Sequence, residues 1–277
     1  MKLFIMLLST LSLIACFETE TSTEISEPKA DTRFNSVSKS DSYSKKKGLG
    51  VSPKLSQDEK CRFVESMNVT WYYDWGNGGM DCGNVEYVPM LWGAPTGKKL
   101  EKKISLKSKK GNLLYLNEPD NVHQSNVPVK KAIRVCHKIR EINDATIIGV
   151  SATRASRDWF KEFMAKENGC IDKLSIHWYG RPNIKKFKKY FNDLYKNYNK
   201  PIWVTEFGIF CGKNDNEEVA LDFLKKATRF LEEKEYIERY VYFMNFNFLN
   251  EKLNCSKGVH KKNTLDLTDI GTFYKKL

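Results

Sequence analysis

Short runs of apolar and β-branched residues alternate with stretches whose apolar residues recur at helical spacing, from about residue 60 to the C-terminus. Several runs are apolar almost without a break, as strands buried on both faces of a parallel sheet usually are. The pattern predicts strands at residues 69–74, 86–91, 113–117, 146–152, 174–178, 201–207 and 239–246.

The stretches between these strands predict amphipathic helices, because their apolar residues fall on one face. Examples are residues 132–139, 159–164, 187–198 and 219–231. Asp215 and Glu218 have the spacing of a capping box just before the apolar positions of the last helix. This spacing predicts that the helix begins there.

Alternating strands and helices predict an α/β fold with a parallel sheet, and the length of the region favours a closed (β/α)8 TIM barrel over an open sheet. The pattern yields seven strands, whereas such a barrel has eight. We expect the third strand to be short or degenerate, at about residues 103–106. An open doubly wound sheet is the alternative, but no Gly-x-Gly-x-x-Gly fingerprint follows the first strand.

The first residues have the pattern of an export signal. Lys2 supplies a positive charge, residues 3–14 are apolar, and the small Ala15 precedes Cys16. This apolar stretch is shorter than the ~20 residues of a membrane-spanning helix. Residues 13–16 resemble a bacterial lipobox, so we expect a signal peptide at 1–15 and a lipid on Cys16. An ordinary signal peptide that contains a cysteine is the alternative.

Phe17 follows the cysteine where an inner-membrane retention signal usually has Asp, so we expect an exported bacterial lipoprotein of the outer membrane, periplasmic or surface-exposed. Residues 17–57 are rich in Ser, Thr, Glu and Lys and cannot bury enough surface to offset the entropy of ordering them. We therefore expect a lipidated, disordered tether at 16–57. Residues 58–277 should form the barrel domain, a monomer held at the membrane by its lipid alone.

An even number of cysteines remains if Cys16 carries the lipid, which predicts disulfides in an exported chain. They are Cys61, Cys82, Cys136, Cys170, Cys211 and Cys255, and six cysteines allow fifteen pairings. No Cys-x-x-Cys pair occurs and the four histidines are scattered, so we expect no structural zinc and no other metal.

The formal net charge is +12, and lysines cluster at residues 98–110 and 185–200. Nucleic acid attracts proteins of such charge, but no recognised nucleic-acid motif is present and the export signal argues against that partner. We interpret the lysines as solvated surface. Attraction to an anionic polysaccharide or membrane surface is the alternative.

Two glutamates lie at the carboxyl ends of predicted strands, the face on which barrel enzymes have their active sites. Glu118 follows the strand at 113–117, and Glu206 lies near the end of the strand at 201–207. A carboxylate among apolar residues is costly to desolvate without a partner or a task. A buried ion pair is the alternative for Glu206, and a turn beside Pro119 is the alternative for Glu118.

Together these glutamates predict glycoside hydrolysis, because one carboxyl group must protonate the leaving oxygen while the other attacks or stabilises the anomeric carbon. Aromatic residues near strand ends support the same chemistry, since sugar rings present apolar C–H faces. Trp75, Trp92 and Trp178 are candidate platforms for a sugar, although each could equally belong to the core.

Five motifs occur in a fixed order: Trp-Tyr-Tyr-Asp-Trp-Gly at 71–76, Tyr-Val-Pro-Met-Leu-Trp-Gly at 87–93, Asn-Glu-Pro-Asp at 117–120, His-Trp-Tyr-Gly at 177–180 and Trp-Val-Thr-Glu-Phe at 203–207. This set resembles the glycosyl hydrolase catalytic core family of the alkali-sensitive-linkage type. That group is glycoside hydrolase family 128, in a clan of retaining barrel glycosidases. The resemblance extends from about residue 61 to the C-terminus and implies a cofactor-free endo-β-1,3-glucanase that acts on β-glucan.

The resemblance also implies roles for single residues. Glu118 becomes the general acid/base and Glu206 the nucleophile, while Asn117 resembles the residue that binds the sugar 2-hydroxyl. Tyr179 resembles the residue beside the nucleophile, and His177 would shape that side of the pocket or pack in the core. The lysine-rich stretch after Trp92 departs from the family's usual loop, which leaves endo or exo action open. A glycan-binding lipoprotein without turnover is the alternative function.

Overall fold

The computed structural model describes residues 43–104, 111–210, 212, 216–243, 258–261 and 264–277. The expected signal peptide, Cys16, most of the expected tether, Cys211 and Cys255 lie outside these residues. None of the helices in the described ranges is long and apolar enough to cross a bilayer.

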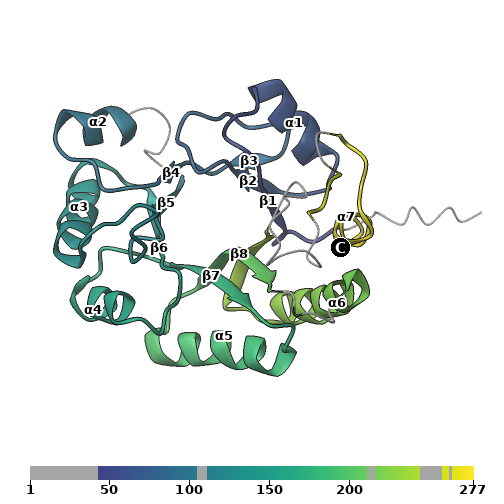
Figure 1. Ribbon diagram of the computed structural model, residues 1–277. Helices are drawn as coiled ribbons and strands as arrows, with labels where there is room; N and C mark the ends of the chain where they lie inside the picture. Colours follow the sequence, from purple (N-terminus) through teal and green to yellow (C-terminus); the bar gives the residue numbers. More distant parts are fainter. Residues whose placement is uncertain (1–42, 105–110, 211, 213–215, 244–257, 262–263) are drawn as a thin grey trace, which may run out of the picture. The chain divides into compact units, whose positions relative to one another are not determined.

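Parallel strands with helices outside them make up the described part of the chain (Figure 1). The strands are β1 (Gly48–Gly50), β2 (Trp71–Tyr73), β3 (Glu86–Tyr87), β4 (Met90–Leu91), β5 (Asn112–Asn117), β6 (Thr146–Ser151), β7 (Leu174–Gly180), β8 (Ile202–Ile209) and β9 (Ile237–Tyr242). They pair as three sheets, β1-β2-β3, β4-β5-β6 and β7-β8-β9. The α/β prediction is confirmed, although the described hydrogen bonds do not form one continuous closed sheet.

Single parallel bridges connect neighbouring sheets. Lys47, just ahead of β1, pairs with Tyr240 of β9, and Ile148 of β6 pairs with Lys173, just ahead of β7. The strand predicted at 86–91 appears as two short strands, β3 and β4. Pro89 lies between them and interrupts the strand, because proline has no N–H to donate.

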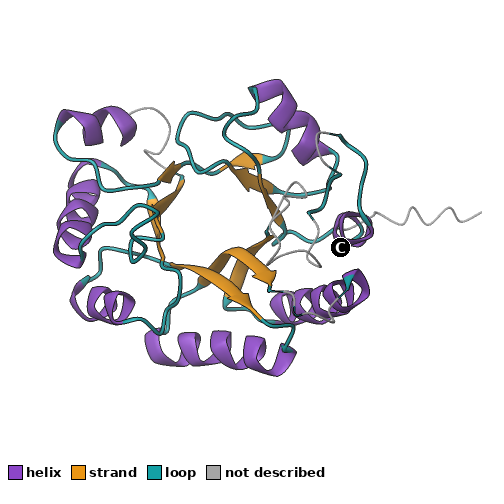
Figure 2. Cartoon of the chain, in the orientation of Figure 1, coloured by secondary structure: helices purple, strands orange, loops and turns teal. Residues whose placement is uncertain are grey.

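The helices surround the strands (Figure 2). They are α1 (Gln57–Glu65), α2 (Lys98–Ile104), α3 (Val129–Ile142), α4 (Asp158–Lys166), α5 (Ile184–Tyr198), α6 (Glu217–Glu233) and α7 (Asp269–Lys275). The four helices predicted from apolar spacing correspond to α3, α4, α5 and α6. The N-cap of α6 is Asn216, whose side chain accepts a hydrogen bond from the Val219 N–H, so the predicted cap at Asp215 was placed one residue too early.

Two sequence predictions about strands were wrong. Residues 103 and 104 of the third strand expected at 103–106 belong to helix α2, which buries Leu100 and Ile104, four residues apart on one helical face. Residues 105 and 106 lie outside the described residues. The strand missing from the pattern is β1, which lies inside the segment expected to be a tether. Its Gly-Leu-Gly sequence has only one apolar side chain, which is too few for a recognisable pattern.

The folded part therefore begins before residue 58. Leu49 and Val51 are completely buried, and β1 pairs with β2 in register from Gly48 to Gly50. The domain boundary expected between residues 57 and 58 lies within the first turn of α1, which begins at Gln57 and has Ser56 as its N-cap. Residues 43–57 thus belong to the fold rather than to a tether.

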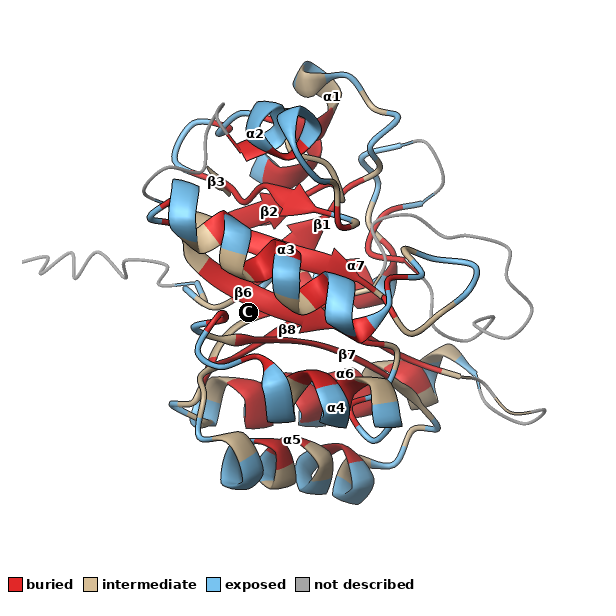
Figure 3. Cartoon of the chain, turned by 90° about the vertical axis from the view of Figure 1, so that its left-hand side faces the viewer, coloured by how far each residue is buried: buried red, intermediate tan, exposed pale blue. Residues whose placement is uncertain are grey.

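Buried side chains form two clusters, one between strands and helices and one enclosed by the strands. The enclosed cluster contains Trp71, Tyr73, Val88, Met90, Leu114, Ile148, Trp203 and Val241, with Trp75 partly buried against it. Figure 3 shows the strands buried and the outer faces of the helices exposed. Disulfides join Cys61 to Cys82 and Cys136 to Cys170, which answers the pairing question for four of the six cysteines.

Candidate active site

A bulge in β8 turns Glu206 towards the side enclosed by the strands. Ile176 of β7 pairs with Val204, but the next residue, His177, pairs with Glu206, so Thr205 is an extra residue in β8. On the other edge Val204 pairs with Tyr240 and Phe207 with Tyr242, again with a shift between them. Such a bulge re-aims the side chain that follows it.

Three aromatic side chains surround the Glu206 carboxylate, whose exposed fraction is 8%. The Tyr179 hydroxyl donates to Oε2 at 2.6 Å, and the Trp75 indole Nε1 donates to Oε1 at 3.0 Å. The Tyr73 hydroxyl lies 3.4 Å from Oε1 and donates to the Thr205 carbonyl oxygen at 2.9 Å. These contacts fix both oxygens of the carboxylate.

Glu118 lies directly after β5 with a positive φ of 44°. Its backbone N–H donates to the Ser151 carbonyl at 2.7 Å, which holds the residue at the end of the neighbouring β6. Its Oε2 accepts a hydrogen bond from Asn121 Nδ2 at 3.0 Å. A non-glycine residue in this backbone conformation is under local strain, which is often concentrated at functional sites.

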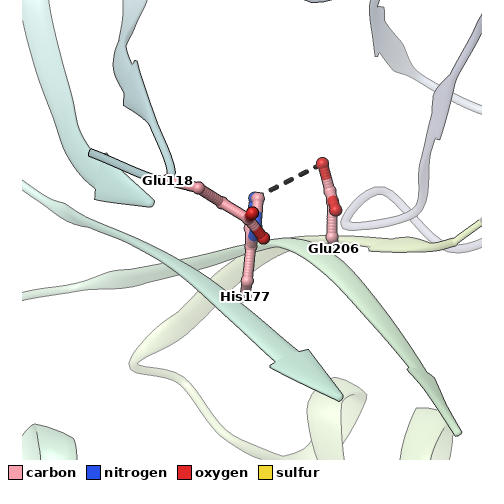
Figure 4. Close-up of side chains that lie close together, drawn as sticks. All are labelled: Glu118, His177 and Glu206. Carbon is pink, nitrogen blue, oxygen red and sulfur yellow. Dashed lines mark hydrogen bonds and ion pairs between the residues drawn. The ribbon is translucent and has the colours of Figure 1, made fainter. Parts of the chain in front are cut away.

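His177 of β7 connects the two glutamates (Figure 4). Its Nδ1 lies 3.2 Å from Glu118 Oε1, and its Nε2 lies 3.4 Å from Glu206 Oε1. One carboxylate oxygen from each glutamate and one ring nitrogen all lie within 4.8 Å of one another. The two predicted catalytic residues, 88 positions apart in sequence, therefore meet at one place.

Opposing influences set the charges of this cluster. Burial acts to lower the pKa of His177, but the carboxylates of Glu206 and Glu118 outweigh it and raise that pKa above its ordinary value. Burial acts to raise the pKa of Glu118, but hydrogen bonds from His177 and Asn121 and the charges of His177 and Arg157 lower it overall. Both shifts favour a protonated imidazole beside an ionised Glu118.

Burial and the charge of Glu206 also raise the pKa of Tyr73 and of Tyr179 well above the ordinary value. Both phenols therefore keep their protons near neutral pH. They face the Glu206 carboxylate as hydrogen-bond donors rather than as competing anions.

Glu118, His177 and Glu206 also have the residue types and spacing to hold a metal ion. The two carboxylates contact opposite nitrogen atoms of one imidazole ring, however. A metal ion bound by all three would have to replace at least one of these contacts. The expectation that the reaction uses no metal or cofactor stays a prediction.

Asn117 is buried beside the acid residue. Its Nδ2 donates to Gln124 Oε1 at 3.3 Å, while its Oδ1 is buried and has no hydrogen-bond partner among the described residues. A buried acceptor without a partner is costly unless something else supplies a donor. A substrate hydroxyl would do so.

The three tryptophans predicted as sugar platforms lie in different environments. Trp75 is a hydrogen-bond donor to Glu206. Trp92 follows β4, is 38% exposed, and accepts a backbone hydrogen bond from Asn117 at 3.0 Å, which places it beside the site. Trp178 was predicted wrongly, because it stacks on Phe223 of α6 with ring centroids 5.5 Å apart.

Strand alternation explains the position of Trp178. Successive side chains of a strand point to opposite faces, so His177 and Tyr179 face the glutamates while Trp178 faces the helices. Tyr73 and Asn121 are site residues that were not predicted from the sequence. Tyr73 lies two residues from Trp75 on the same face, which is a usable signal, whereas nothing in the local sequence marks Asn121.

Residues 48–274 match the family described as Glycosyl hydrolase catalytic core. A search of the curated proteins gave no match. The family resemblance found in the sequence is therefore confirmed by an independent comparison.

Solved structures with a similar fold include three enzymes. A family 128 subgroup I endo-β-1,3-glucanase from Amycolatopsis mediterranei, in complex with laminaritriose, is 22% identical at a TM-score of 0.68, over 84% of this chain and 99% of that one. A subgroup II endo-β-1,3-glucanase from Sorangium cellulosum is 21% identical at a TM-score of 0.67, over 83% of this chain and 97% of that one. A subgroup III curdlan-specific exo-β-1,3-glucanase from Blastomyces gilchristii, in complex with glucose, is 28% identical at a TM-score of 0.62, over 84% of this chain and 98% of that one.

Proposed function

We propose that this chain, which belongs to the glycosyl hydrolase catalytic core family, is a retaining endo-β-1,3-glucanase. The observation that carries the mechanism is the separation of the two carboxylates, whose nearest oxygens lie within 4.8 Å of one another. Retaining glycosidases hold these groups about 5–5.5 Å apart, whereas inverting enzymes leave about 6.5–9.5 Å for a water molecule between them.

The proposed reaction has two steps. Glu118 donates its proton to the glycosidic oxygen while the Glu206 carboxylate attacks the anomeric carbon, so the shortened glycan leaves and a glycosyl ester forms. Glu118 then takes a proton from water, whose oxygen attacks the same carbon and breaks the ester bond to Glu206. Two inversions at one carbon retain its configuration.

His177 would store the proton that the first step needs. Without substrate, the raised pKa of His177 and the lowered pKa of Glu118 favour imidazolium and carboxylate. A sugar that fills the site excludes water, which favours a neutral pair over an ion pair with incomplete solvation. The proton can then pass from Nδ1 to Oε1 across the 3.2 Å contact, which leaves Glu118 as an acid.

The closed (β/α)8 barrel is the proposed setting for this chemistry. If β3 and β4 are two parts of one interrupted strand, the described strands number eight, and the single bridges beside β1 and β7 lie where the three sheets would join. Glu118 then follows the fourth strand and Glu206 lies on the seventh. Barrel enzymes have their active sites at this carboxyl face.

The preference for β-1,3-glucan is supported by the neighbours, which are described as acting on it, two of them by endo action. The test is incubation of the purified protein with β-1,3-, β-1,4-, mixed-linkage and acidic glycans, with product sizes and the anomer first released read by chromatography and NMR. We expect oligosaccharides from β-1,3-glucan with retained configuration.

Glu118→Gln and Glu206→Gln should each abolish nearly all turnover. Undiminished turnover by either variant would refute the assignment, and binding without turnover by the unmodified protein would favour a glycan-binding lipoprotein.

The membrane anchor is a further part of the proposal and rests on the N-terminal sequence alone. Lys2, the apolar residues 3–14 and the segment ending at Cys16 support lipidation of that cysteine and export to the outer membrane. Cys16→Ser should release the protein from the membrane fraction of the expressing bacterium. A variant that still sediments with membranes would argue against a lipid anchor.

A further inference from the structure

The bulge in β8 places two consecutive side chains on the same side of the strand. Val204 and Phe207 lie in the cluster between strands and helices. Thr205 and Glu206, which stand between them, both bond to residues on the enclosed side. Regular alternation from Trp203, whose side chain is in the enclosed cluster, would instead turn Glu206 outwards.

Two serine hydroxyls contact the hydroxyl of the extra residue, Thr205. Thr205 Oγ1 lies 2.9 Å from Ser175 Oγ and 3.3 Å from Ser151 Oγ, and the two serine oxygens lie 2.5 Å apart. All three residues are at most 1% exposed. Each hydroxyl has one proton to donate and can also accept, so a triangle of three can satisfy every donor without water. The serines come from β6 and β7, two strands other than the one that is bulged.

We propose that Thr205 is a positioning residue for the nucleophile, and that the Ser151–Ser175–Thr205 triangle selects the strand register in which Glu206 faces Glu118. A slip of β8 by one residue against β7 would remove the bulge and move Glu206 to the helix-facing side. The triangle opposes this slip, because in the slipped register Thr205 would pair with His177 and its hydroxyl would move along β7, away from Ser175 Oγ. The Tyr73 hydroxyl adds a second restraint through the Thr205 carbonyl.

This inference deepens the proposed function and, where activity is concerned, rests on it. Displacing a reacting group by about 1 Å can cost roughly 100-fold in rate. Thr205→Val keeps the shape of the side chain and removes only its hydroxyl. We expect kcat to fall roughly 10- to 100-fold on β-1,3-gluco-oligosaccharides while KM changes by less than about twofold.

Two variants separate positioning from a general loss of packing. Thr205→Ser restores the hydroxyl and should restore most of kcat. Thr228→Val is the matched control, because Thr228 of α6 is also fully buried and its hydroxyl donates to backbone carbonyls of its own helix, at Leu224 and Lys225. It should leave kcat unchanged. If Thr205→Val does not fold, Ser175→Ala removes a different corner of the triangle and carries the same test.

A readout independent of turnover distinguishes this inference from the proposed function. The Trp75 indole N–H donates to Glu206 Oε1, so its NMR resonance reports where the carboxylate lies. We expect this resonance to move in Thr205→Val and to return in Thr205→Ser. If the unmodified protein cleaves no glycan, the proposed function fails while the indole shift still tests the register. Wild-type kcat together with an unmoved Trp75 resonance in Thr205→Val would overturn the inference.

Discussion

The imidazole Nδ1 of His177 lies 3.2 Å from Oε1 of Glu118, so the acid–base residue of the proposed reaction is within hydrogen-bond distance of a buried histidine. His177 belongs to β7, whereas Glu118 follows β5, and these two strands are not hydrogen-bonded to each other. The contact raises the pKa of His177 and lowers that of Glu118.

The first prediction concerns pH and stability. The raised pKa of His177 contributes stability that is fully present below its ordinary value of 6.5 and lost as pH rises through the folded-state pKa. The lowered pKa of Glu118 contributes stability present above its ordinary value of 4.5 and lost as pH falls through the folded-state pKa. Glu118→Gln should therefore destabilise the protein most between pH 4.5 and pH 6.5, as measured by urea unfolding at a series of pH values.

The same variant should lower the pKa of His177, because it removes a carboxylate partner. NMR titration of the imidazole in the unmodified protein and in Glu118→Gln measures this directly. An unchanged His177 titration would mean that the two side chains do not share a proton.

The second prediction uses two tryptophans with different positions. Trp75→Phe removes the indole donor to Glu206, and a hydrogen bond to a charged group contributes about 1.5–3 kcal/mol, so kcat should fall at least about tenfold. Trp178→Phe is the matched control, since it changes packing against Phe223 on the helix side. It should lower the melting temperature by several degrees and leave kcat intact. Loss of kcat in both variants alike would contradict the assigned orientations.

The third prediction concerns where the folded domain begins. A chain that starts at residue 43 should fold, whereas one that starts at residue 58 loses β1 and the buried Leu49 and Val51. It also loses Lys46 and Lys47, whose ammonium groups donate to carbonyl oxygens at the C-terminal ends of α6 and α7. The shorter chain should be insoluble or unfolded by circular dichroism.

Leu49→Ala in the full chain is a milder version of that test. Truncating a fully buried leucine typically costs about 2–5 kcal/mol, which should be visible as a lower urea midpoint with an unchanged m-value. Leu55→Ala is a suitable comparison, since Leu55 is only partly buried against the same core. Equal stability of the two variants would argue that β1 is dispensable.

The fourth prediction concerns the disulfide between Cys136 and Cys170, which closes a loop with a sequence separation of 34. Chain entropy assigns such a crosslink about 3–4 kcal/mol. Replacing both cysteines by alanine should lower the free energy of unfolding by an amount of this order. Turnover below the new melting temperature should persist, because both cysteines are buried in the cluster between strands and helices, whereas Glu118 and Glu206 face the enclosed side. A loss of turnover in the folded variant would place the disulfide in the function of the site.

Local sequence determined a large part of this protein. Apolar runs and helical spacing predicted the positions of β5 to β8 and of α3 to α6, since burial imposes those periods on the side chains of each element. The same runs placed Glu118 and Glu206 at strand ends, where parallel strands bring side chains to one face. The order of five motifs then indicated the family, which comparison confirmed.

Tertiary structure decided what depends on contacts between distant segments. β1 is a strand only because β2 and β9 flank it, and its own three residues carry no pattern. The bulge at Thr205 turns Glu206 inwards because hydroxyl groups from β6 and β7 meet it there. His177 contacts Glu118 because folding brings Nδ1 of the one within 3.2 Å of Oε1 of the other. Sequence periodicity reports which face of an element is buried, but it contains no information about the neighbour that meets that face.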